Sequence, residues 1–203
     1  TIADIGPDTD WAEALSGIDT VVHLAGRAHV TSESIADSEE KYNRINAAGT
    51  ECLAHGAADI GVKRFIFLST VKVMGEKTQG VPFSELDAPA PEDFYGASKQ
   101  AGEQALHRIA RESNLEDVIL RPPLLYGPGA KGNILSLLKL CRLAPPLPLA
   151  AINNRRSLLF IGNLVDAVIS CLDSPNAARQ TFFVRDGEDL STSELISRVG
   201  CAL

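Results

Sequence analysis

The sequence predicts an α/β protein built on a doubly wound parallel sheet, with helices on both faces of the sheet. Short, almost continuously apolar runs recur along the chain, as is typical of strands that are buried on both faces. Longer stretches with apolar or small residues at helical spacing separate several of these runs. Strands that alternate with long helices form parallel βαβ units, because a parallel neighbour is reached only through a crossover connection.

Four runs are expected to be strands, and two stretches between them are expected to be helices. Gly26 ends the first run and Pro122-Pro123 follows the third, as expected where a buried strand gives way to a turn. The strand runs are Thr20 to Ala25, Arg64 to Ser69, Val118 to Leu120 and Thr181 to Val184. The helical stretches are Ser38 to Ile60 and Gly96 to Arg111.

The regular alternation ends near Tyr126. Gly127-Pro128-Gly129 and the Pro145-Pro146-Leu147-Pro148 run interrupt the pattern and leave short, irregular elements. We therefore expect a large α/β domain over residues 1–126. Residues 127–203 are expected to form mainly a small C-terminal substrate-binding cap, with one or more elements returning to the first domain.

Composition excludes several classes of function. The net charge of −7 over 203 residues argues against a nucleic-acid binder, which needs basic groups to meet the phosphate backbone. No apolar run approaches the roughly 20 residues of a membrane span, so we expect a cytoplasmic protein without a membrane partner. The cysteines are scattered and form no CxxC pair, so neither a metal site nor a disulfide framework is expected. They are Cys52, Cys141, Cys171 and Cys201.

Tyr95 and Lys99 form the most informative pair of side chains. They lie four residues apart, so on a helix a phenol and an ammonium project from one face. A cation at that place lowers the pKa of the tyrosine from about 10 towards neutrality. The spacing alone also fits a solvated surface pair. However, Ser69-Thr70 ends a predicted strand, at the sheet edge where ligands of such folds bind.

Several motifs follow one another in a fixed order. They are Phe65 to Glu76, Tyr95 to Lys99 and Arg121 to Pro128, with further likeness from Asp4-Ile5 to the Asp186-Gly-Glu-Asp-Leu-Ser stretch. In this order they resemble the NAD-dependent epimerase/dehydratase family of extended short-chain dehydrogenases/reductases, over essentially the whole chain. The resemblance implies a Rossmann-like fold in which residues 1–126 are part of a dinucleotide-binding domain.

The resemblance also implies roles for matching residues. Thr70 would bond the reacting sugar oxygen, Tyr95 would be the acid/base catalyst, and Lys99 would be its electrostatic partner and hold the nicotinamide ribose. The implied cofactor is NAD, with NADP as an alternative. The implied cofactor-binding residues are Asp4, Ile5, Leu24, Ala25, Gly26, Asn46, Tyr95, Lys99 and Pro122.

For a UDP-sugar substrate, the resemblance implies contacts from Thr70, Asn133 and Arg156, the last pairing bidentately with the diphosphate. Other interpretations stay open, because Asn133 also suits a helix cap and Arg156 also suits an exposed basic pair with Arg155. His23 lies in a predicted strand and is expected to be a hydrogen-bonded core residue. Lys72 and Glu76 are expected to form a solvated surface pair rather than to line the pocket mouth.

Two parts of the family pattern are expected to be missing. Nothing before Thr20 supplies the Gly-x-x-Gly-x-x-Gly loop that binds pyrophosphate at a helix N-terminus, and the third strand barely begins at Asp4. The N-terminal βαβ portion, with the residue that selects NAD over NADP, is therefore expected to be absent. The chain also stops after Cys201, short of the family's last helices. A protein that truly began at Thr1 would be expected to bind the dinucleotide weakly and to aggregate.

The function implied by the resemblance is epimerisation of a UDP-hexose at C4, through a 4-keto sugar and a retained NAD, by a homodimer. An alternative is a 4-keto reductase or dehydrogenase for UDP-N-acetyl-amino sugars in surface polysaccharide synthesis, which Lys72 to Glu76 and Pro146 to Leu149 resemble. Val71-Lys72 disfavours a 4,6-dehydratase, which carries Asp-Glu there. A non-catalytic dinucleotide sensor is also disfavoured, since Tyr95 and Lys99 are both present.

Overall fold

The computed structural model describes residues 4–28, 35–78, 80–130, 133–142 and 154–202. The chain divides into two units, of which the first comprises Thr1–Pro122 with Ala167–Phe183, and the second comprises Pro123–Asp166 with Val184–Leu203. The chain leaves the first unit slightly before the boundary expected at Tyr126. It returns to that unit once, through a helix and a strand.

The first unit contains a parallel sheet with the strand order β1-β2-β3-β6. The strands are β1 (Thr20–His23), β2 (Arg64–Leu68), β3 (Glu116–Arg121) and β6 (Gln180–Phe183). Val22 lies opposite Ile66, which lies opposite Val118, so the strands end along one edge. The four predicted strands and their parallel pairing are confirmed. Polar residues that follow these strands are thereby brought to a common edge.

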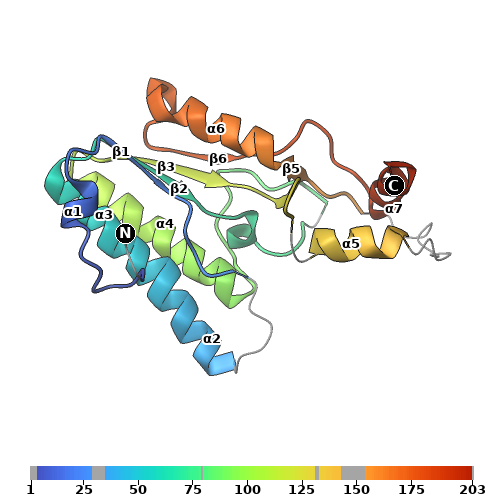
Figure 1. Ribbon diagram of the computed structural model, residues 1–203, viewed down its shortest axis with the longest axis horizontal. Coiled ribbons are helices and arrows are strands. Elements are labelled where there is room, and N and C mark those ends of the chain that lie inside the picture. The colour runs from blue at the N-terminus through green and yellow to red at the C-terminus, as the bar shows by residue number, and fades with distance from the viewer. Residues whose placement is uncertain (1–3, 29–34, 79, 131–132, 143–153, 203) are drawn as a thin grey trace. The chain divides into compact units, whose positions relative to one another are not determined.

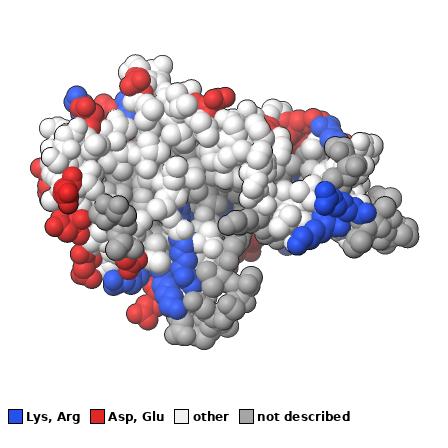
Figure 2. Space-filling view, viewed as in Figure 1, with Lys and Arg blue, Asp and Glu red and all other residues white. Residues whose placement is uncertain are grey.

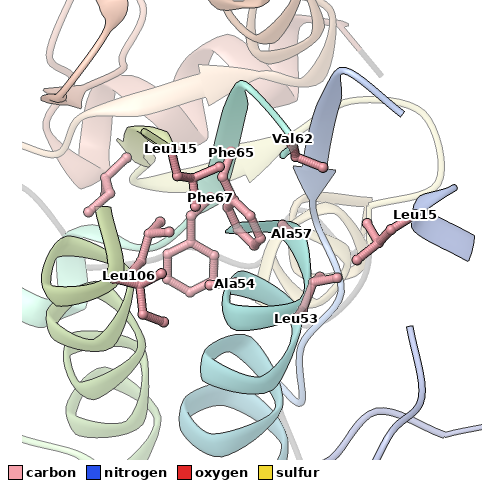
Figure 3. Close-up of a cluster of buried hydrophobic side chains, with 11 residues drawn as sticks. Leu15, Leu53, Ala54, Ala57, Val62, Phe65, Phe67, Leu106 and Leu115 are labelled. Atoms are coloured by element: carbon pink, nitrogen blue, oxygen red, sulfur yellow. The ribbon is translucent and has the colours of Figure 1, made fainter. Parts of the chain in front are cut away.

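Helices cover both faces of this sheet (Figure 1). On one face lie α3 (Gly49–Ile60) and α4 (Phe94–Glu112), and Figure 3 shows Phe67 of β2 between Leu106 of α4 and Ala54 of α3. On the other face, Arg64 donates hydrogen bonds of 2.7 and 2.9 Å to the Cys171 and Leu172 carbonyls of α6 (Ile161–Asp173). The doubly wound arrangement is confirmed.

The predicted helix at Ser38 to Ile60 has a widened turn in its middle. The chain runs from α2 (Ile35–Tyr42) through a π-helical segment (Asn43–Ala48) into α3 without a break. Glycines allow close packing here, because a Cβ on Gly102 of α4 would lie 2.7 Å from the Asn46 carbonyl oxygen. A Cβ on Gly49 would lie 2.8 Å from Ile5. Single π-helical turns are rare and often mark functional sites.

Short elements complete the first unit. A four-residue helix, α1 (Ala12–Leu15), precedes β1, and a 3₁₀ turn (Val71–Met74) follows β2. A second 3₁₀ turn (Pro175–Ala177) leads into β6. On the face shown in Figure 2, acidic side chains lie over the region of α1 and α3, in keeping with the negative net charge.

The second unit is built around a two-stranded parallel sheet of β4 (Leu124–Tyr126) and β5 (Leu158–Phe160). It also contains α5 (Asn133–Arg142), the first part of α6, and α7 (Thr192–Ala202). Asp186 links β4 to α6 by accepting hydrogen bonds from the Tyr126 hydroxyl at 2.9 Å and the Asn163 amide at 2.6 Å. Throughout both units, the described helices include none with the length and apolar character of a membrane span.

Candidate active site

The candidate site lies in the first unit, at the carboxyl edge of the sheet. Backbone hydrogen bonds from Ser69 to Leu120 at 2.8 Å and from Val71 to Pro122 at 3.0 Å continue the pairing of β2 and β3 beyond the strands. The turn that carries Thr70 is therefore fixed beside the end of β3. As the sequence predicts, this edge also carries the loop after β1, and α4 brings Tyr95 and Lys99 to it.

Thr70 begins the 3₁₀ turn after β2. Its backbone is extended, with φ −158° and ψ 150°, and its hydroxyl accepts a hydrogen bond from the Lys72 backbone N–H at 3.3 Å. The Thr70 hydroxyl lies close enough to Tyr95 to lower the pKa of that phenol. The structure therefore brings the two hydroxyls together from segments that lie far apart in the sequence.

Tyr95 lies in the first turn of α4, which Asp93 caps. The Asp93 carboxylate accepts a hydrogen bond of 2.6 Å from the Gly96 backbone N–H. Gly96 packs against the turn that follows Thr70, since a Cβ there would lie 2.7 Å from the Lys72 carbonyl oxygen. The Tyr-Gly pair thus has a steric reason, because a larger residue after Tyr95 would push the helix away from Thr70.

The expectation that the pKa of Tyr95 lies below its usual value is wrong for this chain taken alone. Burial raises the pKa of Tyr95 above its usual value, and the Asp93 carboxylate raises it further. The opposing influences come from Lys72 and from the Thr70 hydroxyl. Tyr42, 6.0 Å away between ring centroids, raises the pKa slightly more. Burial depends on tertiary packing, which the four-residue spacing does not report.

Lys99 is almost completely buried, with an exposed fraction of 3%. Its ammonium lies 3.9 Å from the centroid of the Phe67 ring, and a Cβ on Gly26 would lie 3.7 Å from its Nζ atom. Burial lowers the pKa of Lys99 to about 7, although Glu103 opposes the shift. No hydrogen bond of this ammonium occurs within the described part of the chain. Since such burial is costly, a ligand oxygen would be bound favourably here.

Asn46 shapes the loop after β1. Its side-chain oxygen accepts a hydrogen bond of 2.7 Å from the Arg27 backbone, and its amide donates to the Arg27 carbonyl and the Ser98 hydroxyl, both at 3.0 Å. The side chain is therefore engaged within the protein, and its exposed fraction is 1%. Asn46 borders Gly26, whose Cβ would lie 3.1 Å from the Asn46 oxygen.

Sequence reasoning missed Ser98 and the buried pair of Glu103 and Arg121. The Ser98 hydroxyl donates to the Tyr95 carbonyl at 2.8 Å and accepts from Asn46, so it links the loop after β1 to α4. Arg121 donates to Glu103 at 3.0 and 2.6 Å, and both side chains are buried. Two features of the sequence could have pointed to these residues. Ser98 lies between Tyr95 and Lys99, and Glu103 follows Lys99 by one helical turn.

The remaining residues expected to bind the cofactor occupy varied environments. The Asp4 carboxylate is exposed and accepts from the Ile5 backbone at 2.9 Å, and Ile5 packs against Gly49. Leu24 and Ala25 are exposed after β1, and the exposed fraction of Leu24 is 58%. Pro122 is buried, and its carbonyl accepts from Val71. They lie in the first unit together with Thr70, Tyr95 and Lys99.

One expectation for a polar residue is confirmed, and another is confirmed only in part. His23 is a core residue that hydrogen-bonds to Thr50 at 3.1 Å and stacks on Phe67, and burial, aided by Lys99, lowers its pKa to about 4. Lys72 and Glu76 form a partly exposed pair at 2.6 Å. The pair is larger than expected, because Asp93 also accepts from Lys72, at 2.5 Å.

The two candidate substrate residues of the second unit are described unequally. Arg156 forms a backbone bridge with Leu190, through hydrogen bonds of 2.8 and 3.0 Å, and its exposed guanidinium has no partner among the described residues. Its neighbour Arg155 reaches the Asp189 carbonyl at 3.4 Å. Asn133 is the first residue of α5, and its side chain lies outside the described part, as does the Pro146 to Leu149 stretch.

Several known proteins are similar to this chain in sequence or in fold. The family model described as the NAD dependent epimerase/dehydratase family matches residues 1–184. The chain is 47% identical over 204 residues to UDP-glucose 4-epimerase of Vibrio cholerae, covering 100% of the chain and 62% of that protein. It is 29% identical over 202 residues to N-acetyl-alpha-D-glucosaminyl-diphospho-ditrans,octacis-undecaprenol 4-epimerase of Escherichia coli O157:H7, covering 98% and 59%.

A solved structure agrees. UDP-glucuronic acid 4-epimerase from Bacillus cereus, in complex with UDP-glucuronic acid and NAD, has a TM-score of 0.81 at 28% identity, over 95% of this chain and 62% of that one. The chain therefore spans between 59% and 62% of the length of these three relatives. The family match covers most of the chain, and the parallel sheet agrees with it, so this chain belongs to the NAD dependent epimerase/dehydratase family.

Proposed function

We propose that the protein containing this chain inverts the configuration at C4 of a UDP-hexose, by oxidising C4 to a ketone and reducing it from the other face. The observation that carries the proposal is the meeting of Thr70, Tyr95 and Lys99 at the carboxyl edge of the sheet. The 47% identity with a UDP-glucose 4-epimerase supports this choice of reaction and substrate class.

The proposed cofactor is NAD, which is present in the Bacillus cereus complex. The residues fit it, because Lys99 holds a buried ammonium without a hydrogen bond in the described part, and Gly26 keeps the loop beside it free of a side chain. In this proposal Tyr95 and Lys99 hold the nicotinamide ribose, with Pro122 beside the nicotinamide. The loop Leu24–Gly26 follows the phosphates, and Asp4 and Ile5 border the adenine. The cofactor supplies reversible hydride acceptance, which protein side chains cannot provide.

Each side chain has a defined task in the proposed reaction. Thr70 orients the sugar C4 oxygen by a hydrogen bond, and the ionised Tyr95 accepts the proton of the C4 hydroxyl. Lys99 in its charged form stabilises the phenolate. Tyr95 must ionise although burial and Asp93 raise its pKa, so positive charge near its hydroxyl is a requirement of the reaction.

We also assign the two structural units to different tasks. The first unit would bind the dinucleotide, and the second would bind the UDP-sugar through Arg156 and Asn133. Support comes from the guanidinium of Arg156, which is exposed and has no partner among the described residues, and a guanidinium matches a diphosphate in geometry and charge.

Assembly, location and biological role follow from the family resemblance. We propose a cytoplasmic homodimer that pairs through the helices α2 to α3 and α4, and a role in surface polysaccharide synthesis. Sedimentation of the complete protein tests the dimer, and a monomer at all concentrations would contradict it. Loss of surface polysaccharide after deletion of the gene tests the role.

The reaction is tested by incubating the complete protein with UDP-glucose and following products by proton NMR. The expected result is a mixture of UDP-glucose and UDP-galactose that is reached without net change in NADH. One NADH consumed or formed per sugar would instead indicate the reductase or dehydrogenase alternative. A protein that binds NAD but converts none of a panel of UDP-sugars would indicate the sensor hypothesis.

A further inference from the structure

Lys72 is held between two carboxylates. Its ammonium donates to Asp93 at 2.5 Å and to Glu76 at 2.6 Å, with about a third of its side chain exposed. Asp93 is not an arbitrary partner, because its second oxygen caps α4 at Gly96 with a hydrogen bond of 2.6 Å. The ammonium is therefore attached, through one carboxylate, to the helix turn that carries Tyr95.

The backbone of the same residue contacts both catalytic segments. The Lys72 N–H donates to the Thr70 hydroxyl at 3.3 Å, and the Lys72 carbonyl lies against Gly96, where a Cβ would be only 2.7 Å away. Lys72 thus connects the Thr70 turn to the start of α4 through its N–H, its carbonyl and its side chain. A relative displacement of Thr70 and Tyr95 would have to break these contacts.

The surrounding loop reinforces this connection. The Glu92 carboxylate accepts from the Glu76 backbone at 3.0 Å, and Ala90 donates to the Val73 carbonyl at 3.0 Å. Gly75 between them has φ 123°, and a Cβ there would lie 3.1 Å from Glu92. The segments around Lys72 and Asp93 are therefore locked together by backbone contacts and do not depend on the ammonium alone.

The charged groups around Tyr95 matter because its hydroxyl must ionise in the proposed reaction. Asp93, the N-cap of α4, and Lys72, on the turn after β2, both act on Tyr95, and Lys99 lies one helical turn further along α4. Tyr42 faces it from α2, and Arg27 lies over the Tyr42 ring at 5.7 Å. The Asp93 carboxylate raises the pKa of Tyr95, whereas Lys72 lowers it.

Lys72 is suited to this task by its own ionisation. Partial burial disfavours its charge, but hydrogen bonds to Asp93 and Glu76 outweigh burial and raise its pKa. Lys72 is therefore charged throughout the neutral range. By contrast, the pKa of Lys99 is about 7, so near neutral pH that lysine is charged in only part of the molecules.

We propose that Lys72 is a positioning residue for the reaction, which acts through Asp93: its ammonium offsets the negative charge of the Asp93 carboxylate beside Tyr95. The inference depends on the proposed epimerase function, because Tyr95 is its base. The inference adds Lys72 to the set of Thr70, Tyr95 and Lys99. It assigns a role to the positive charge on the turn that follows Thr70.

The test compares Lys72→Met, Lys72→Arg and the control Lys77→Met in the complete enzyme, by measuring kcat and KM from pH 5.5 to 9.5. Lys77 is an exposed lysine close by in the sequence. Lys72→Met is expected to move the acid limb of kcat upward by about one pH unit, which is about a tenfold loss below that limb. Activity should recover at high pH, and KM should change by less than about twofold. Lys72→Arg should restore most of the loss, and Lys77→Met should match the wild type.

A second variant keeps the proposal testable if Lys72→Met does not fold. Asp93→Asn retains a capping side chain but removes the negative charge, so the acid limb should move downward. An unchanged pH profile in the Lys72→Met enzyme, or a loss of equal size at every pH, would overturn the proposal. So would an upward shift in Asp93→Asn.

Failure of the proposed function would look different. In that case the wild type would epimerise no UDP-hexose. The ionisation of Tyr95 can then still be measured without an activity assay. Phenol carbon NMR of protein labelled at tyrosine, with Tyr95→Phe to assign the signal, gives the Tyr95 titration in the presence of NAD. The proposal predicts that Lys72→Met raises this titration by about one unit, and an unshifted titration would overturn it.

Discussion

Gly102 lies where α4 crosses the π-helical turn of Asn46, and Gly102→Ala is expected to destabilise the protein. A new Cβ would lie 2.7 Å from the Asn46 carbonyl oxygen and 3.2 Å from the Phe67 ring. Alanine in place of glycine within a helix gains about 1 kcal/mol. Overpacking against a fixed backbone costs about 1 to 3 kcal/mol, so the net loss of unfolding free energy reaches at most about 2 kcal/mol. This corresponds to a fall in Tm of up to about 8 °C.

Gly56→Ala is the matched control, because Gly56 also lies within a helix. A Cβ there would meet only side-chain atoms of Leu15 and Trp11, at 3.3 and 3.5 Å, which can adjust. Thermal and urea unfolding of both variants, with calorimetric titration of NAD, provides the measurement. Gly102→Ala should also weaken NAD binding, since displacing Asn46 releases the loop at Arg27. If Gly102→Ala proved as stable as Gly56→Ala, the close crossing at Asn46 would be refuted.

Three further predictions concern single side chains. Tyr95→Phe should reduce kcat by a factor on the order of a hundred or more, with UDP-sugar binding nearly intact. Wild-type turnover of this variant in a steady-state assay would contradict the assignment of Tyr95 as the base. Arg156→Ala should weaken UDP-sugar affinity by roughly 1.5 to 3 kcal/mol at unchanged NAD content. An unaltered affinity in calorimetry would instead indicate that Arg156 is part of an exposed basic pair with Arg155. His23 has its pKa lowered to about 4 in the folded state, against about 6.5 when unfolded. The resulting stability is present above about pH 6.5 and is lost as pH falls towards 4. Urea unfolding of wild type and His23→Gln between pH 4 and 7 should therefore show a steeper loss in the wild type, and equal slopes would contradict this.

The strands and long helices could be predicted because their signals are local. Phe65 to Phe67 form part of a short apolar run that is typical of a strand buried on both faces, and the small residues of α4 recur at helical spacing. The position of Thr70 at the carboxyl edge followed from the parallel order of the strands. Consequently the three catalytic candidates could be expected at one edge before the structure was known.

The contacts that support the site could not be predicted, because they join residues far apart in the sequence. Asn46 reaches Ser98 across 52 positions, and Lys72 reaches Asp93 across 21. The π-helical turn at Asn46 packs closely against Gly102 of another helix, a contact that no periodicity of its own segment reveals. The raised pKa of Tyr95 likewise results mainly from burial, a tertiary property.

The account rests most directly on oxidation and reduction at the same sugar carbon, which isotope tracing can follow. The complete protein would be incubated with UDP-glucose carrying deuterium at C4, and both epimers would be isolated and examined by NMR and mass spectrometry. If hydride is removed and returned within one active site, UDP-galactose should form with deuterium kept at C4 and without release of NADH. The Tyr95→Phe variant should form almost no UDP-galactose. UDP-galactose that has lost the deuterium to solvent, or no C4 epimer from any UDP-hexose supplied, would contradict the account.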